Sequence, residues 1–194
     1  MSEFTTFVRV GFQHITDLAA IDHLLFLVAL VAPYRPRDWR HLLGVASAFT
    51  VGHSITLALV ATGTIGFPTA LIEFLIPVTI VAAGLENLRR RGKRPQGWVR
   101  PALAGGFGLI HGAGFAGFLA DMFGGNITRP LLAFNVGIEL GQITILVLGL
   151  GVLTGVDRLL TLGVRTPDIA PRRIATSLVA AVWAAVMAVQ RVPW

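Results

Sequence analysis

Residues 131–153, LLAFNVGIELGQITILVLGLGVL, form an apolar run that is long enough to cross a bilayer as a single helix. The run carries one charged side chain, Glu139. Further runs of similar length and composition occupy residues 10–32, 41–61, 69–88, 101–118 and 174–192. The sequence therefore predicts an all-α, polytopic integral membrane protein, in which six transmembrane helices form a single transmembrane domain over residues 1–194.

The overall composition supports this prediction. Hydrophobic residues make up 54% of the chain and charged residues 13%, whereas about a quarter of the residues in a soluble domain are charged. The chain contains no cysteine, which excludes disulfides, thiolate chemistry and cysteine-ligated zinc. The N-terminal residues lack the basic region, apolar core and small-residue cleavage site of a secretory signal, so we expect the first helix to be retained.

Basic residues are distributed unevenly among the predicted loops. Of the 16 basic residues, all except Arg9, Arg129 and Arg191 lie in or beside the loops that follow the first, third and fifth runs. Because short cytoplasmic loops are enriched in Lys and Arg, we predict that both termini face away from the cytoplasm, an N-out and C-out topology. The basic segment at residues 89–100 directly follows a predicted helix and has no nucleic-acid-binding motif. We therefore expect the lipid bilayer, and no nucleic acid, as its neighbour.

Polar side chains interrupt the apolar runs at three depths. An ionised group in hydrocarbon costs several kcal/mol unless it faces the protein interior and finds partners, so these residues mark a candidate site. The midplane level consists of Asp22, His23, His53, His111, Glu139 and Gln142. In the predicted topology His14, Glu73 and Asn135 lie toward the outside, and Glu86 lies toward the cytoplasm. We interpret the three levels as a path for an ion.

The predicted metal ligands are His14, Asp22, His23, His53, Glu73, His111 and Glu139, with Asn135, Gln142 and Glu86 in supporting roles. No residue is assigned a catalytic role. The spacing of Asn135, Glu139 and Gln142 places them on one helical face, which we expect to point inward.

Three features of this set have alternative interpretations. Asn135 and Gln142 could instead form hydrogen bonds between helices, and Glu86 could pair with a cytoplasmic arginine. The glycine-rich segment at residues 105–117 either packs closely against another helix or is broken around His111, as helices are in some transporters.

The donor types limit the choice of metal. Imidazole and carboxylate ligands suit divalent Ni, Co or Zn, whereas Cu(I) favours Cys and Met. The three methionines, at positions 1, 122 and 187, do not adjoin the midplane level. The sequence therefore predicts a divalent transition metal ion, and it does not rank nickel, cobalt and zinc.

Five motifs follow one another along the first five predicted helices. They are GFQHITD at 11–17 with IDHLLFL at 21–27, AFTVGHSITL at 48–57, IEFLIP at 72–77, GLIHGAGF at 108–115 and FNVGIELGQ at 134–142. Together they resemble the HupE/UreJ family over nearly the whole chain. The resemblance implies a small multi-pass protein of the bacterial inner (cytoplasmic) membrane, linked to nickel or cobalt supply for hydrogenase or urease. The chain is similar to the shorter branch of that family.

The sequence favours a transporter over an enzyme: a permease for a divalent transition metal of the nickel or cobalt type. In this interpretation His14 and Glu73 capture the ion, the charged and imidazole side chains at the midplane hold it, and release passes Glu86. One alternative is an intramembrane zinc-dependent hydrolase, which the His and carboxylate residues would allow although the chain has no His-Glu-x-x-His motif. A second is a metal-binding accessory membrane protein. Oligomeric state and coupling to protons are not predicted.

Overall fold

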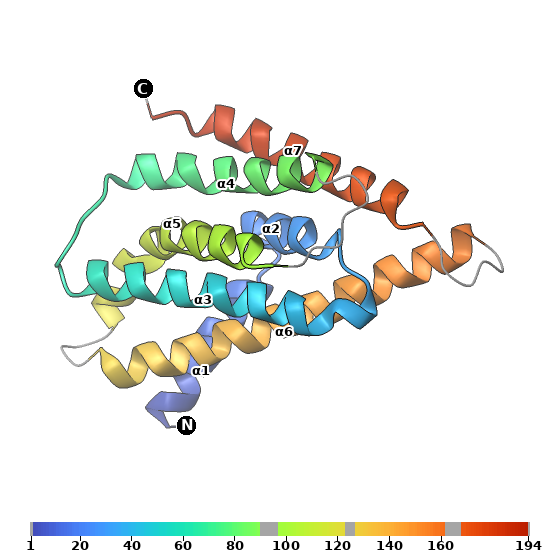
Figure 1. Cartoon of the computed structure of the whole chain (residues 1–194). Helices are drawn as coiled ribbons and strands as arrows, with labels where there is room; N and C mark the ends of the chain where they lie inside the picture. Colours follow the sequence, from blue (N-terminus) through green and yellow to red (C-terminus); the bar gives the residue numbers. More distant parts are fainter. Residues whose placement is uncertain (1, 90–96, 123–126, 162–167, 194) are drawn as a thin grey trace.

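The described part of the chain is entirely helical. The computed structural model describes residues 2–89, 97–122, 127–161 and 168–193. Within these ranges there is no strand, and the helices are α1 (Glu3–Thr16), α2 (Ile21–Val31), the short 3-10 helix η1 (Pro36–Asp38), α3 (Trp39–Ala61), α4 (Thr69–Arg89), α5 (Val99–Met122), α6 (Thr128–Leu160) and α7 (Ala170–Gln190) (Figure 1). The all-α prediction is confirmed.

Most of the helices are suited to a bilayer. Within the described ranges, four segments are long and apolar enough to cross a membrane, namely Pro36–Ala61, Thr69–Arg89, Thr128–Leu160 and Ala170–Gln190. The bent pair formed by α1 and α2 makes a fifth candidate. The remaining predicted span corresponds to α5, which has 24 residues and is not among these candidates. Four or five candidate spans are what we expect of a membrane protein.

The prediction of one continuous helix over residues 10–32 is wrong. The chain turns by 72° between α1 and α2, and residues 17–20 lie outside both helices. The Asp17 carboxylate accepts a hydrogen bond from the Ala19 N–H at 2.9 Å. Short polar side chains of this kind offer the backbone an alternative to helical hydrogen bonds, which favours the break.

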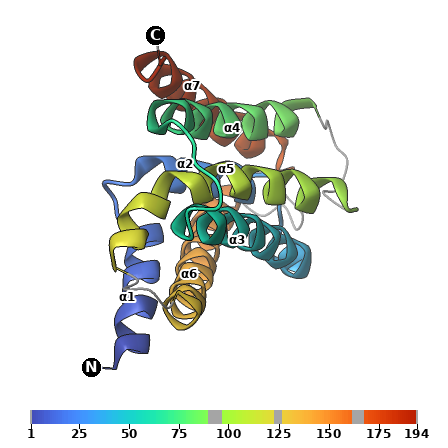
Figure 2. The same ribbon diagram turned by 90° about the vertical axis from the view of Figure 1, so that its left-hand side faces the viewer.

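The helices pack mainly as three pairs, α1 with α6, α3 with α5, and α4 with α7. The short helix α2 contacts α4, α6 and α7, and in Figure 2 it lies between the α4–α7 pair and α1. Six of its residues are buried: Leu25, Phe26, Leu27, Ala29, Leu30 and Val31. A helix that is apolar around its circumference requires such an enclosed position.

Positive charge is concentrated at one end of the molecule. At the end where α2, α4 and α6 finish, the described basic residues are Arg35, Arg37, Arg40, Arg89, Arg100, Arg158, Arg172 and Arg173. The opposite end, where α3, α5 and α7 finish, includes Arg129 and Arg191. Five basic residues used in the topology prediction, Arg90, Arg91, Lys93, Arg94 and Arg165, lie outside the described residues.

Close packing explains the glycine-rich segment. The helix α5 continues through His111 without a break, so the alternative of a broken helix is wrong. A Cβ atom added to Gly112 would lie only 2.9 Å from the carbonyl carbon of His53 on α3. Glycine at this position therefore allows the two backbones to touch, as small residues do where membrane helices associate.

The contact at Gly112 makes a prediction about stability. Gly112→Ala will lower the unfolding midpoint temperature of the detergent-solubilised protein, because overpacking costs about 1–3 kcal/mol. The matched control is Gly106→Ala, also in α5, where an added Cβ would meet nothing within 4 Å. That variant will keep or raise the midpoint, since alanine is the better helix former. Equal losses in both variants would contradict the packing explanation.

Candidate functional site

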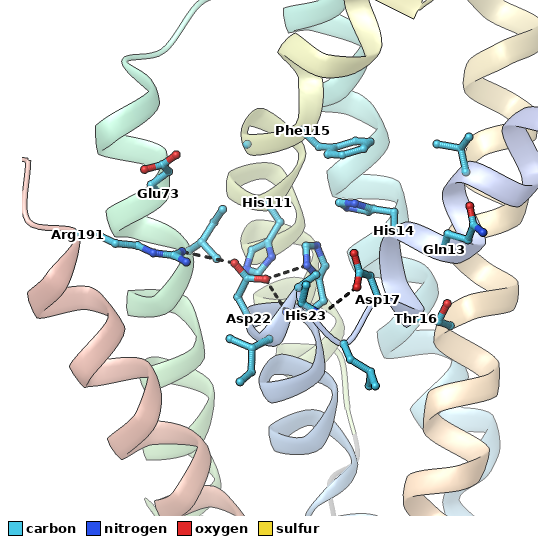
Figure 3. A pocket seen from close by; sticks show the side chains of 17 residues that line it. Gln13, His14, Thr16, Asp17, Asp22, His23, Glu73, His111, Phe115 and Arg191 are labelled. Carbon is cyan, nitrogen blue, oxygen red and sulfur yellow. Dashed lines mark hydrogen bonds and ion pairs between the residues drawn. The ribbon is translucent and has the colours of Figure 1, made fainter.

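A partly open cavity of about 1150 Å³ lies beside the break between α1 and α2. Its lining includes the end of α1, the first turn of α2, the beginning of α4, the second half of α5 and Arg191. Five of the predicted ligands line it: His14, Asp22, His23, Glu73 and His111 (Figure 3). The structure therefore brings together polar residues from four helices.

Asp22 and His23, in the first turn of α2, lie in the middle of the group of side chains that line the cavity (Figure 3). One carboxylate oxygen of Asp22, Oδ1, accepts a hydrogen bond from the His23 backbone N–H at 2.9 Å and lies 3.0 Å from His23 Nδ1. Since an ionised carboxylate only accepts hydrogen bonds, Nδ1 carries the imidazole proton. The His23 Nε2 atom is buried without a hydrogen-bond partner, and its lone pair is available to a ligand.

Four imidazoles form a continuous row through the site. The ring centroids of His14 and His23 are 4.5 Å apart, those of His23 and His111 are 5.8 Å apart, and those of His14 and His53 are 6.1 Å apart. His53 is fully buried, and neither of its ring nitrogens has a hydrogen-bond partner. The row thus contains one imidazole each from α1, α2, α3 and α5.

Thr79 on α4 orients His111. The Thr79 hydroxyl donates to the Ile76 carbonyl at 2.7 Å, and the same oxygen lies 2.9 Å from His111 Nε2. A hydroxyl has one proton, so Nε2 must be the donor in the second contact. The proton on Nε2 leaves a lone pair on Nδ1, and that atom is buried without a partner. Hydrogen bonds of this kind fix the orientation of metal-binding histidines.

The remaining predicted ligand, Glu139, lies elsewhere. Its carboxylate accepts a hydrogen bond from the Ser47 hydroxyl on α3, and the Gln142 carbonyl accepts one from Thr50 at 3.1 Å. The inward-facing side of α6 therefore meets α3. Asn135 Oδ1, on the same side of α6, is buried without a partner. These contacts support the interpretation of Gln142 as a residue that joins helices.

The described side chains do not form a ready-made metal centre. Among the residues that the structure covers, no three His, Asp or Glu side chains adopt an arrangement that could hold one ion. The donor atoms are instead available in pairs and in a row. In this arrangement the described donors could meet a cation two at a time, as one carboxylate and one imidazole for example, whereas a resident catalytic zinc takes three protein ligands.

Glu86, at the opposite end of the molecule, has an arginine partner. Arg100 on α5 contacts Glu86 Oε2 at 2.7 Å and also donates to the Asn87 side chain. The Asn87 amide in turn donates to the Ala29 carbonyl at 2.7 Å. The ion-pair alternative for Glu86 is thus observed. Burial raises the pKa of the neighbouring Tyr34 phenol, whose ring lies under the Arg100 guanidinium.

Aromatic side chains separate the two polar regions. The Phe26 ring centroid is 5.5 Å from that of His111 and 4.7 Å from that of Phe49. On its far side Phe26 lines a small cavity of about 30 Å³ together with Glu86, Arg100 and Phe107. Phe26 therefore lies between the open cavity and the Glu86–Arg100 pair.

Two residues of the site were not found by sequence reasoning. Arg191 approaches Asp22 from the end of α7, with its Nη1 3.5 Å from Asp22 Oδ2 (Figure 3). The sequence feature that could have identified Arg191 is its position at the end of the last apolar run, on the side of the predicted membrane that has few basic residues. Thr79 gave no signal, because threonine inside an apolar helix usually bonds to its own backbone.

Comparisons with known proteins agree with the resemblance of the motifs. A family model described as "HupE / UreJ protein" matches residues 1–193. No curated protein and no solved structure matches the chain.

The contact between Thr79 and His111 makes a spectroscopic prediction. Thr79→Val removes the oxygen that holds the Nε2 proton, so the His111 ring will show mixed tautomers, whereas Thr79→Ser will keep the Nε2–H form. Nitrogen-15 NMR of histidine-labelled protein measures this directly. His53, whose ring nitrogens have no hydrogen-bond partner, provides an internal control whose signal will not change. A single unchanged tautomer at His111 in Thr79→Val would contradict the assignment.

Proposed function

Because the chain belongs to the HupE/UreJ family, we propose that it is a membrane permease for a divalent transition metal of the nickel or cobalt type. The family is associated with nickel or cobalt transport or with an accessory function. The observation that carries the proposal is that His23 and His111, which line the open cavity together with Asp22, each have a buried ring nitrogen without a hydrogen-bond partner, Nε2 and Nδ1 respectively. Imidazole and carboxylate are the donors that these divalent ions accept.

The histidine row suits a cargo ion. A conducted ion must bind strongly enough to enter and weakly enough to leave, which several incomplete sites in sequence achieve better than one complete site. The open cavity receives the ion through Glu73 and His14, and Asp22, His23 and His111 then replace part of its water in succession rather than together. His53 is the next imidazole after His14 in the row. Glu139 takes part only if the ion also reaches the place where the Glu139 carboxylate meets Ser47 of α3.

The path continues past Phe26 in this mechanism. Displacement of the Phe26 ring would connect the open cavity with the small cavity beside Glu86. Glu86 would exchange its partner Arg100 for the ion before release. The resident zinc of the hydrolase alternative needs three protein ligands in place, and no observation on the described residues favours that alternative.

Membrane orientation follows from the charge distribution in the same proposal. The basic end of the molecule faces the cytoplasm of a bacterial inner membrane, and both termini lie outside. The open cavity is lined by Glu73 near the beginning of α4 and by Arg191 after the end of α7, so it faces the outside. Six spans result when α5 crosses the membrane beside α3.

A flux measurement tests the function. Proteoliposomes that contain the wild-type chain will take up Ni²⁺ or Co²⁺, and Asp22→Asn or His23→Ala will lower the initial rate by about 10-fold or more, because a lost ligand or its oriented partner typically costs this much. His41→Ala, which removes a histidine outside the cavity lining, is the matched control and will keep the wild-type rate. No uptake by the wild-type protein would refute the permease, and tightly retained zinc in the same sample would support the hydrolase.

Reporter tags test the orientation. A tag at either terminus will be accessible from the periplasmic side, and a tag inserted between α4 and α5 will be accessible only from the cytoplasm. A tag in the connection between α3 and α4 will be accessible from the periplasmic side, like the tags at the termini. Cytoplasmic labelling of either terminus would invert the proposed path.

A further inference from the structure

We propose that Arg191 is a built-in counter-cation, which occupies the Asp22 carboxylate when no metal is bound and competes with the metal for it. This inference rests on the proposed function. It assigns a role to a residue that neither the motifs nor the family match identifies, and it makes Arg191 a determinant of affinity and release.

The two oxygens of Asp22 have different partners. Oδ1 is engaged by the His23 backbone N–H at 2.9 Å and faces His23 Nδ1 at 3.0 Å. Oδ2 faces Arg191 Nη1 at 3.5 Å. The oxygen that remains for an incoming cation is therefore the one that Arg191 contacts. A divalent ion can reach this oxygen with full charge attraction only if the guanidinium moves away, because the two like charges repel each other.

Arg191 has a fixed backbone and a side chain that can withdraw. Its N–H donates to the carbonyls of Met187 and Ala188, at 3.1 and 3.2 Å, as the capping residue at the end of α7. Its side chain is 35% exposed and lines the open cavity, whereas the side chain of Asp22 is 16% exposed. The guanidinium can thus leave Asp22 for water without any change in the helix. The carboxylate cannot follow it.

Competition of this kind serves transport in two ways. It keeps a carboxylate in the interior of the protein paired before the ion arrives, which avoids the cost of an isolated charge. It also weakens the metal complex, since the returning guanidinium replaces the ion, and this favours release. A residue that only stabilised the fold would not oppose metal binding.

The experiment is a calorimetric titration of the purified full-length protein with CoCl₂ in detergent. Arg191→Gln, which removes the charge, will bind Co²⁺ about twofold to fivefold more tightly than the wild type, the range expected for one partly exposed ion pair. Arg191→Glu will bind more tightly still, and Arg191→Lys will stay close to the wild type. The matched control, Arg9→Gln, removes an exposed charge on α1 outside the cavity lining and will not change the affinity.

Each possible result of the titration either supports or contradicts the proposed role of Arg191. A rise in affinity in the order Lys, Gln, Glu supports the counter-cation. Equal or weaker binding by Arg191→Gln and Arg191→Glu, with or without a fall in the unfolding midpoint, overturns it and makes Arg191 a structural residue. If Arg9→Gln also tightens binding, the effect is one of overall charge and the inference fails. Absence of Co²⁺ binding by the wild type refutes the proposed function itself, which separates that failure from failure of the Arg191 inference alone.

Discussion

The 72° turn between α1 and α2 determines which side chains can meet in the cavity. In a straight helix, His14 and His23 would be nine residues apart and separated by roughly 13 Å along the axis. The turn brings their ring centroids to 4.5 Å. It also places Asp22 in the first turn of α2, where the unpaired N–H groups of a helix start favour a carboxylate. The enclosure of α2 by α4, α6 and α7 then fixes this arrangement inside the protein.

Local sequence patterns predicted the parts of the structure that depend on local physics. Apolar runs identified the long helices, because helix-length stretches of hydrophobic side chains are visible without knowledge of their neighbours. The break at residues 17–20 was missed because this segment contains neither Gly nor Pro, the usual helix breakers. The predicted inward face of α6 does point at another helix. Its partners, however, are the hydroxyls of Ser47 and Thr50 rather than the histidines.

Contacts between distant parts of the chain account for most of what could not be predicted. Helical periodicity shows which residues share a face, but it does not show which helix packs against that face. Arg191 reaches Asp22 across 169 positions, and Ser47 reaches Glu139 across 92. The glycines of α5 are an intermediate case. Their density predicted close packing, and only the structure shows that Gly112 rests on the backbone of His53, so that one contact positions two histidines of the row.

The two polar regions differ in the groups that they contain, namely arginine–carboxylate ion pairs at the basic end and imidazoles beside Asp22 in the open cavity. At the basic end the charges are paired, Glu86 with Arg100 at 2.7 Å and Asp157 with Arg172 at 2.9 Å. In the open cavity, by contrast, buried lone pairs on His23 and His111 have no protein partner. A buried polar group without a partner is costly, and under the proposed function the ion compensates for this cost at His23 and His111. An ion that moves from the open cavity to the basic end would meet the unpaired imidazole nitrogens first and the Glu86–Arg100 ion pair last. Under the proposed function, this order favours capture on one side of the Phe26 ring and release on the other.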